Sequence, residues 1–458
     1  MNFGHVHHLH FVGIGGAGMC GLAELLHDEG LEVSGCDLAA SETTDRLQSL
    51  GIPITLGHDP GHLTGTQVLV YSSAVAPNNP EVEAARARGI PAIRRAEMLG
   101  EISRLRWAIA VAGTHGKTTT TSLTGFILTR AGYDPTVVVG GRVHALGAHA
   151  RLGRSEYLVC EADEYDRSFL ALHPVLGVLT SIEAEHLDCY GTVEAMEEAF
   201  ATFAERVPFY GAIVACLDDP GVRRLLPRFS RRVITYGYSP QAQVHARKAK
   251  LGREGASCRV VMGDREVGEL RVPLPGRHAL ANALAAIAVA EEVGIDFDKT
   301  AAAVASFTGV ARRFERKGER AGVLVVDDYA HHPTEVAATL QAARQTHPDA
   351  RVVAAFQPHL YSRTRAFAHE FGEALLGADV VVVLPIYPAR EQPIPGVSHH
   401  LVEEAARQSG HRQVVAVDSF EEAIARLNQL VRPGDLLLTL GAGNVVHLGE
   451  RWLAGGDG

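Results

Sequence analysis

The stretch Gly113-Thr114-His115-Gly116-Lys117-Thr118-Thr119 decides the fold of this chain. It follows an apolar run at residues 107–112, which predicts a buried strand, and it precedes a helical pattern at residues 118–131. A loop in this position points backbone N–H groups and the positive end of the helix dipole at an anion. Lys117 can reach the β- and γ-phosphates of a nucleotide, and the Thr118 hydroxyl can bind Mg²⁺. The stretch therefore predicts a phosphate loop that binds ATP.

The match to the usual phosphate-loop pattern is incomplete, because Val111 stands where the pattern has its first glycine. The loop is a shorter variant of the pattern. A helix-capping turn is the alternative interpretation, but a Gly-Lys-Thr sequence directly after a buried strand favours phosphate binding.

Strands alternate with helices on both sides of this loop, which predicts an α/β fold with parallel sheets. The alternation falls into three blocks, and we expect three domains at residues 1–105, 106–312 and 313–458. Residues 230–273 differ, because short alternating runs are separated by Gly-containing turns. They predict antiparallel hairpins added to the central sheet.

A second glycine-rich loop, Gly13-Ile14-Gly15-Gly16-Ala17-Gly18, follows a short apolar run, and Asp37 lies about 20 residues further on. This spacing fits the dinucleotide fingerprint, which is weak evidence when it stands alone. An NAD(P) site, a site for another nucleotide or a nucleotide-sugar diphosphate, and a tight structural turn all remain open on the residues alone.

Acidic and imidazole side chains follow two further strands of the central block. Glu161, Asp163, Glu164 and Asp166 would repel one another unless they were solvated or bound to a cation. Because Glu161 comes first after the strand, we expect it to bind Mg²⁺; a solvated acidic loop is the alternative. His186 follows the next strand, where it could contact the metal or a transferring phosphoryl group, or be an ordinary loop residue.

The third block places Asp328 and His331 after its first strand, and His359 and Arg363 after its second. The carboxyl ends of parallel strands form the ligand-binding edge of an open sheet. Arg363 is a candidate clamp for a carboxylate, because a guanidinium binds carboxylates in a bidentate manner. A solvated surface arginine is the alternative.

Composition excludes several classes of function. The formal net charge of −10 argues against nucleic-acid binding, which favours a basic patch. No apolar stretch reaches about 18 residues and the N-terminus lacks a secretory pattern, so we expect a cytoplasmic protein with no membrane partner. The six cysteines form no C-x-x-C pair, which favours buried free thiols over a disulfide framework or a zinc ribbon.

Eight motifs, taken in order along the whole chain, resemble those of the Mur ligase family. They are GIGGAGM at 13–19, GTHGKTTT at 113–120, EADEYDRSFL at 161–170, HLD at 186–188, PGRHALAN at 275–282, RRFE at 312–315, DDYAHHPTE at 327–335 and FQPHLYSRT at 356–364. The resemblance implies a Rossmann-like N-terminal domain for a UDP-sugar, a central ATP-binding domain and a Rossmann-like C-terminal domain for an amino acid. On this basis the first glycine loop binds the UDP-sugar diphosphate and not NAD.

The resemblance also implies a role for each matching residue. The implied catalytic residues are Lys117, His186, Arg313 and His331, and the implied metal ligands are Thr118, Glu161 and His186. The implied ATP contacts are Gly113, Thr114, His115, Gly116, Lys117, Thr118, Thr119, His278, Asn282, Arg313 and Asp328. The implied UDP-sugar contacts are Gly15, Gly16, Ala17, Gly18, Asp37, Ser72, Ser73 and Arg363. The implied amino-acid contacts are His331 and His359.

The implied reaction is the ATP- and Mg²⁺-dependent joining of L-alanine to the carboxylate of UDP-N-acetylmuramate through an acyl phosphate, by a monomer or weak homodimer. One alternative is a recycling ligase that attaches a peptide to the same sugar nucleotide. Another is a nucleotide-binding regulator or an NAD-dependent oxidoreductase.

Two positions depart from the family patterns, and one residue type used by sibling ligases is missing from part of the chain. Ala279 replaces an asparagine, and Leu360 stands where many relatives have arginine. No lysine occurs between Lys117 and Lys248, so a carbamylated lysine of the kind used by sibling ligases cannot come from that region.

Overall fold

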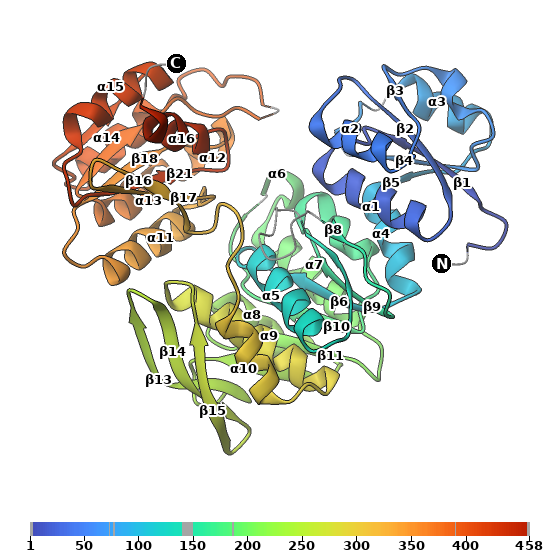
Figure 1. Ribbon diagram of the computed structural model, residues 1–458, viewed down its shortest axis with the longest axis horizontal. Helices are drawn as coiled ribbons and strands as arrows, with labels where there is room; N and C mark the ends of the chain where they lie inside the picture. Colours follow the sequence, from blue (N-terminus) through green and yellow to red (C-terminus); the bar gives the residue numbers. More distant parts are fainter. Residues whose placement is uncertain are drawn as a thin grey trace. The chain divides into compact units, whose positions relative to one another are not determined.

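The computed structural model describes residues 3–72, 74–76, 78–139, 150–185, 187–389 and 391–455. These residues form three sheets of five, ten and six strands with helices between them (Figure 1). The predicted α/β class with three sheet-containing parts is confirmed. The chain divides into two compact units. The first comprises Met1–Arg247, Arg259–Gly268 and Ala281–Phe307, and the second comprises Lys248–Cys258, Glu269–Leu280 and Thr308–Gly458.

The N-terminal sheet has the strand order β3-β2-β1-β4-β5, and all its strands are parallel. The strands are β1 (His8–Val12), β2 (Glu32–Asp37), β3 (Ile54–Leu56), β4 (Val68–Tyr71) and β5 (Ala92–Arg94). The helices are α1 (Ala17–Asp28), α2 (Glu42–Ser49), η1 (Pro60–Leu63), α3 (Pro80–Ala87) and α4 (Arg95–Arg104). The chain leaves β1 toward β2 and later returns to β4 on the other side, so the first glycine loop lies at the topological switch point.

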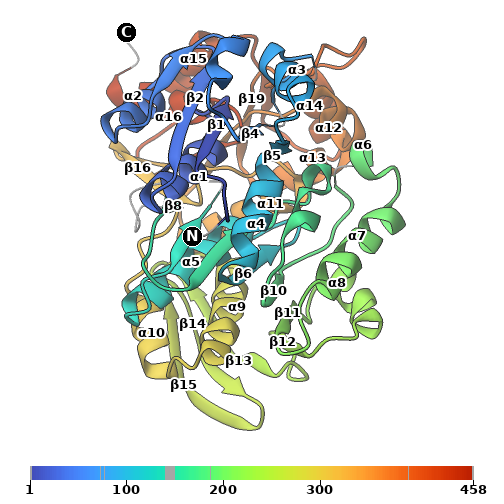
Figure 2. The same cartoon turned by 90° about the vertical axis from the view of Figure 1, so that its right-hand side faces the viewer.

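The central sheet has the order β15-β14-β13-β12-β11-β10-β6-β9-β7-β8. Its strands are β6 (Trp107–Ala112), β7 (Thr136–Val138), β8 (Ala150–Arg151), β9 (Tyr157–Glu161), β10 (Leu176–Leu179), β11 (Ala212–Cys216), β12 (Val233–Gly237), β13 (Val244–Gly252), β14 (Gly255–Met262) and β15 (Arg265–Val272). Figure 2 shows β6, β10, β11 and β12 side by side. Only the dipeptides Arg253-Glu254 and Gly263-Asp264 connect β13, β14 and β15, as two successive hairpins require.

The helical segments of this region are α5 (Lys117–Arg130), η2 (Tyr165–Ala171), α6 (Leu187–Tyr190), α7 (Val193–Glu205), α8 (Pro220–Leu225), η3 (Leu226–Arg228), α9 (Arg277–Val293) and α10 (Phe297–Ala305). The phosphate loop lies between β6 and α5. Because β9 and β10 flank β6 on its two sides, this loop is also at a point where the direction of strand addition reverses.

The C-terminal sheet has the order β16-β17-β21-β18-β19-β20. Its strands are β16 (Glu315–Arg320), β17 (Val323–Asp328), β18 (Val352–Phe356), β19 (Val380–Val383), β20 (Val414–Ala416) and β21 (Leu436–Leu440). Only the edge strand β16 is antiparallel. The helical segments are α11 (Pro333–Thr346), α12 (Tyr361–Ala366), α13 (Ala368–Ala374), η4 (Leu375–Gly377), α14 (His400–Gln408), α15 (Phe420–Leu430) and α16 (Val446–Ala454).

Strand β18 shows why its sequence is apolar without alternation. Val352, Ala354 and Phe356 belong to one hydrophobic core, and Val353 and Ala355 belong to another on the opposite face of the sheet. A parallel sheet that is covered by helices on both faces requires apolar residues at every position of its central strands. Among the described residues, no helix combines the length and the apolar character needed to cross a bilayer.

Candidate nucleotide site

The phosphate loop takes a backbone shape that requires its two glycines. Gly113 has φ 131° and Gly116 has φ 82°, both in the region that side chains disfavour. A Cβ on Gly113 would lie 2.1 Å from Thr180 Oγ1, and a Cβ on Gly116 would lie 2.6 Å from Asn282 Oδ1. Helix α5 begins at Lys117, one residue before the predicted start, so the loop opens directly onto the helix N-terminus.

Residues at the end of β10 hold this loop in place. The backbone N–H of Thr114 donates to the Ser181 carbonyl at 2.9 Å, and the N–H of His115 donates to Ser181 Oγ at 3.0 Å. The Thr180 hydroxyl donates to the His115 carbonyl at 2.5 Å. Thr180 and Ser181 were not among the predicted site residues, because nothing in the local sequence shows that β10 neighbours β6.

Lys117 is the central charge of the loop. Its Nζ donates to the carbonyl oxygens of Gly113 and Thr114, at 2.6 and 3.2 Å, and pairs with Glu164 at 2.8 Å. Burial alone would lower the pKa of Lys117, but Glu164 and Asp163 raise it above its ordinary value. The lysine is therefore held protonated, and Glu164 is an acidic partner that the sequence had shown only as one of four carboxylates.

Thr118 and Glu161 lie at the same edge of the central sheet. Thr118 is in the first turn of α5, and Glu161 ends β9, where it pairs in register with Val111 of β6. One hydroxyl and one carboxylate beside a phosphate loop suit Mg²⁺, which keeps waters and substrate phosphates as its other ligands. The expected third ligand, His186, lies outside the described residues, as does the expected UDP-sugar contact Ser73.

A cleft opens beside Glu161 within the first unit. Gly18, Arg95, Glu161, Asp163 and Ser168 line its polar part. A Cβ on Gly18 would lie 2.7 Å from a terminal guanidinium nitrogen of Arg95, so this arginine lies against the N-terminal turn of α1. Sequence reasoning missed Arg95, because an arginine at a helix start carries no motif.

The first glycine loop is fixed by strand β2. The N–H groups of Gly13 and Ile14 donate to the Cys36 carbonyl at 2.9 and 3.0 Å, and the N–H of Gly15 donates to Asp37 Oδ2 at 2.8 Å. Asp37 therefore shapes the loop directly. Gly16 precedes α1 as its N-cap residue, so the free N–H groups of α1 begin here. Two other expected UDP-sugar contacts lie in the same sheet domain. Ala17 is the first residue of α1, and Ser72 directly follows β4.

Three of the predicted C-terminal residues form one cluster. The rings of His331 and His359 lie edge to face with centroids 5.7 Å apart, and Arg363 Nη1 lies 3.2 Å from His359 Nδ1. His359 also stacks on Tyr387, at 5.7 Å between centroids. Leu360, which departs from the family pattern, has φ 69° and donates its N–H to the Tyr387 carbonyl.

The neighbouring residues Arg312 and Arg313 make different kinds of contact. Arg312 is structural, since it pairs with buried Asp327 and donates to the carbonyls of Gly441 and Gly443. Arg313 lies over the Tyr329 ring and 3.7 Å from Glu335, and its side chain is partly exposed.

Asp328, an expected ATP contact, is buried. Its two carboxylate oxygens accept the backbone N–H groups of Phe314 and Ala330 at 2.7 and 2.8 Å. Burial raises the pKa of Asp328 to about 6. This carboxylate fixes the turn that carries Arg313.

The remaining expected ATP contacts lie on α9. Asn282 faces Gly116, and His278 is one helical turn earlier, on the same face of the helix. Ala279, the other departure from the family pattern, is buried, so an apolar residue fills that place.

The fold and the site together define a class: multidomain α/β enzymes with a nucleotide-binding phosphate loop in the central sheet. Residues 8–107 match the model of the Mur ligase family catalytic domain, residues 111–290 that of the Mur ligase middle domain, and residues 312–443 that of the Mur ligase glutamate ligase domain. The chain belongs to the Mur ligase family.

Three relatives show how close the similarity is. The UDP-N-acetylmuramate–L-alanine ligase of Solidesulfovibrio magneticus is 52% identical over 449 residues, which cover 98% of both chains. The structure of a UDP-N-acetylmuramate–alanine ligase from Thermotoga maritima has a TM-score of 0.79 at 27% identity and covers 97% of this chain and 98% of that one. A UDP-N-acetylmuramate:L-alanyl-γ-D-glutamyl-meso-diaminopimelate ligase from Neisseria meningitidis is 32% identical with a TM-score of 0.62, covering 67% of this chain and 100% of that one.

We expect Gly113→Ala to abolish ATP binding, because the added Cβ collides with Thr180 and distorts the loop. Gly132→Ala is the matched control: Gly132 also has a positive φ, of 90°, but an added Cβ would meet nothing within 4 Å. Titration calorimetry with ATP measures both. Equal affinities in the two variants would contradict the proposed constraint at Gly113.

We expect Lys117→Ala to destabilise the protein by roughly 3 kcal/mol, because it leaves Glu164 buried without its cation. The double variant Lys117→Ala/Glu164→Gln should recover part of this loss without recovering ATP binding. Urea unfolding measures the first effect and calorimetry the second. A double variant no more stable than Lys117→Ala would show that the two residues are not coupled.

We expect Asp328 to make the protein less stable as the pH rises from about 4 to about 7. The folded chain keeps the Asp328 proton up to a pKa of about 6, whereas the unfolded chain loses it near 4, so ionisation opposes folding. The unfolding free energy should fall by about 3 kcal/mol over this pH range through Asp328, and this fall should be absent in Asp328→Asn. The measurement is the difference in unfolding free energy between wild type and variant at each pH; a constant difference would contradict the assignment.

Proposed function

We propose that this protein joins L-alanine to the lactyl carboxylate of UDP-N-acetylmuramate at the expense of ATP, for peptidoglycan synthesis. The observation that carries the proposal is the 52% identity to a UDP-N-acetylmuramate–L-alanine ligase over 98% of both chains. The site supplies what an ATP-dependent ligase needs, since Lys117 is protonated, lies in a phosphate loop and sits at the N-terminus of α5.

The proposed reaction has two steps. The substrate carboxylate attacks the γ-phosphorus of ATP and ADP leaves, which gives an acyl phosphate. The amine of L-alanine then attacks the acyl carbon, the tetrahedral intermediate loses phosphate, and the amide remains. Catalysis rests on positioning and charge neutralisation, as in other phosphoryl transfers.

Lys117 would leave its contact with Glu164 and neutralise the negative charge that develops on the transferring phosphoryl group. The backbone N–H groups of Lys117, Thr118 and Thr119, in the first turn of α5, would hold the β-phosphate. Thr118 and Glu161, with His186, would hold Mg²⁺, which when bound neutralises phosphate charge.

The glycine loop after β1 would bind the UDP-sugar diphosphate with the first N–H groups of α1. Arg95 supports this assignment, because its guanidinium lies against Gly18 and lines the cleft that also contains Glu161. A diphosphate in this place would meet both a helix N-terminus and a fixed cation. Ser72, Ser73 and Asp37 complete the expected contacts.

The C-terminal cluster would bind the remaining substrate groups. His331 accepts or orients the ammonium proton of L-alanine, His359 contacts the amino acid, and Arg363 contacts the UDP-sugar. Arg313 and Asp328 would contact ATP phosphate and ribose, and His278 and Asn282 would also contact the nucleotide. The domains at 1–105, 106–312 and 313–458 would thus each hold one substrate.

The decisive experiment measures ADP release with Mg·ATP and UDP-N-acetylmuramate, adding L-alanine, L-serine or glycine in turn. We expect release to depend on both the sugar nucleotide and the amino acid, with L-alanine giving the highest kcat/KM. Lys117→Ala should abolish release while UDP-sugar binding persists. ADP release that is unchanged when the sugar nucleotide is omitted would contradict the proposal.

A second candidate acceptor is the tripeptide L-alanyl-γ-D-glutamyl-meso-diaminopimelate. The 32% identity to a ligase for that peptide makes the comparison necessary. In the same assay, a tripeptide that exceeds L-alanine in kcat/KM would favour this candidate.

A further inference from the structure

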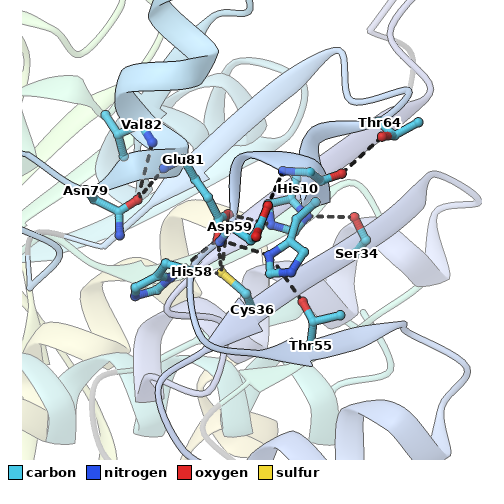
Figure 3. A network of polar contacts seen from close by, with 12 residues as sticks. His10, Ser34, Cys36, Thr55, His58, Asp59, Thr64, Asn79, Glu81 and Val82 are labelled. Atoms are coloured by element: carbon cyan, nitrogen blue, oxygen red, sulfur yellow. Dashed lines mark hydrogen bonds and ion pairs between the residues drawn. The ribbon is translucent and has the colours of Figure 1, made fainter.

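Five side chains with metal-binding chemistry converge on the α3 side of the N-terminal sheet. Figure 3 labels four of them, His10, Cys36, His58 and Glu81. His10 comes from β1, Cys36 from β2, His58 from the loop after β3, His62 from η1 and Glu81 from the first turn of α3. We refer to these residues as the His–Cys–Glu cluster. The phosphate chemistry proposed above uses none of them.

Four ligand atoms of the cluster share one small volume. Those of His10, Cys36, His62 and Glu81 all lie within 4.8 Å of one another. The carboxylate of Glu81 is the centre: it lies 3.0 Å from His10 Nε2, 3.1 Å from Cys36 Sγ and 3.1 Å from His62 Nδ1. His58 Nδ1 approaches from a further side, at 3.3 Å from Cys36 Sγ and 3.4 Å from Glu81.

The cluster is buried where charge is costly. Glu81 and Cys36 have no exposed surface and His10 has 2%. A carboxylate in such a place needs a cation or an equivalent set of donors. One divalent ion would balance one carboxylate and one thiolate, so the occupied site would carry no net charge.

A second layer of contacts already orients these side chains. Ser34 Oγ lies 2.9 Å from His10 Nδ1, which leaves Nε2 directed at Glu81. The backbone N–H of Asp59 donates to Glu81 at 3.0 Å, and Asn79 caps the helix turn that carries Glu81. Histidines that bind metals characteristically use their other ring nitrogen for such a contact.

We propose that His10, Cys36, His62 and Glu81 form a structural zinc site. Zinc bonds of about 2.0–2.3 Å in a tetrahedron place neighbouring ligand atoms about 3.3–3.8 Å apart. His10 Nε2 lies 3.0 Å from one oxygen of Glu81, and Cys36 Sγ and His62 Nδ1 lie 3.1 Å from the other oxygen. Since all four ligand atoms lie within 4.8 Å of one another, shifts of about 1 Å or less would bring them to tetrahedral separations. Sulfur, nitrogen and oxygen ligands in a closed four-coordinate set suit Zn²⁺ over Mg²⁺ or Ca²⁺.

Binding balances in protons and charge. The Cys36 thiol, which donates to Glu81 in this structure, loses its proton to solvent as the S–Zn bond forms. The two imidazoles bind as neutral groups and Glu81 as a carboxylate. One Zn²⁺ is taken up and one proton is released.

A metal ion at this site would also stabilise the glycine loop after β1, through Cys36. The side chain of Cys36 belongs to the cluster, while its carbonyl accepts the N–H groups of Gly13 and Ile14. An ion held by the four ligand side chains would tie η1 and α3 to the paired strands β1 and β2.

The test uses the full-length protein, stripped of metal with a chelator and titrated with Co²⁺ in the absence of ATP and Mg²⁺. We expect one equivalent to bind with the intense ligand-field bands of tetrahedral cobalt and a thiolate-to-cobalt charge-transfer band, and Zn²⁺ to displace it. Cys36→Ser should lose the charge-transfer band. Cys20→Ser, a buried cysteine of the same sheet domain outside the cluster, should keep it.

His62→Gln is a second test of the site in case Cys36→Ser misfolds. His62 is partly exposed, so its replacement should be better tolerated. We expect this variant to bind Co²⁺ at least about tenfold more weakly. Even the removal of a residue that only hydrogen-bonds to a metal ligand lowers metal affinity about 10- to 100-fold. Far-UV circular dichroism checks that both variants are folded. No charge-transfer band in the wild type, a band that survives Cys36→Ser, or equal Co²⁺ affinity in folded His62→Gln would each overturn the proposal and leave a purely hydrogen-bonded network.

Discussion

The contact between the phosphate loop and the end of β10 is the constraint on which the nucleotide site depends. Gly113 lies so close to Thr180 that no side chain fits between them, and Ser181 accepts N–H groups from two successive loop residues. The loop therefore keeps its shape because two neighbouring parallel strands bring their carboxyl ends together. The position of α5, and with it Lys117 and Thr118, follows from that arrangement.

Much of this arrangement could be predicted from the sequence. The alternation of strands with helices correctly predicted parallel sheets. The structure adds that both faces are covered, since the side chains of β18 pack alternately into two cores. The Gly-containing turns at residues 252–255 and 263–264 correctly predicted the added hairpins. Local rules suffice for these features, because periodicity and turn chemistry act over a few residues.

The features that escaped prediction depend on partners distant in the sequence. Glu164 pairs with Lys117 across 47 residues, and Arg95 lies against Gly18 of another element. The His–Cys–Glu cluster was missed for the same reason: its cysteine has no C-x-x-C partner, and its histidines lie on separate elements. The absence of a cysteine pair had favoured plain buried thiols, but a mixed ligand set needs only one cysteine.

The pair between Lys117 and Glu164 has a consequence for how the enzyme releases its product. In this structure the Lys117 ammonium group already donates hydrogen bonds to a carboxylate and two carbonyl oxygens. If Lys117 binds the nucleotide phosphates as proposed, an arriving nucleotide would have to replace these contacts, so its affinity would be the difference between two sets of strong interactions. After transfer of the γ-phosphate, ADP would offer Lys117 less charge, and Glu164 would compete for the lysine more effectively. Glu164 would then favour release of ADP and return the loop to the conformation seen here.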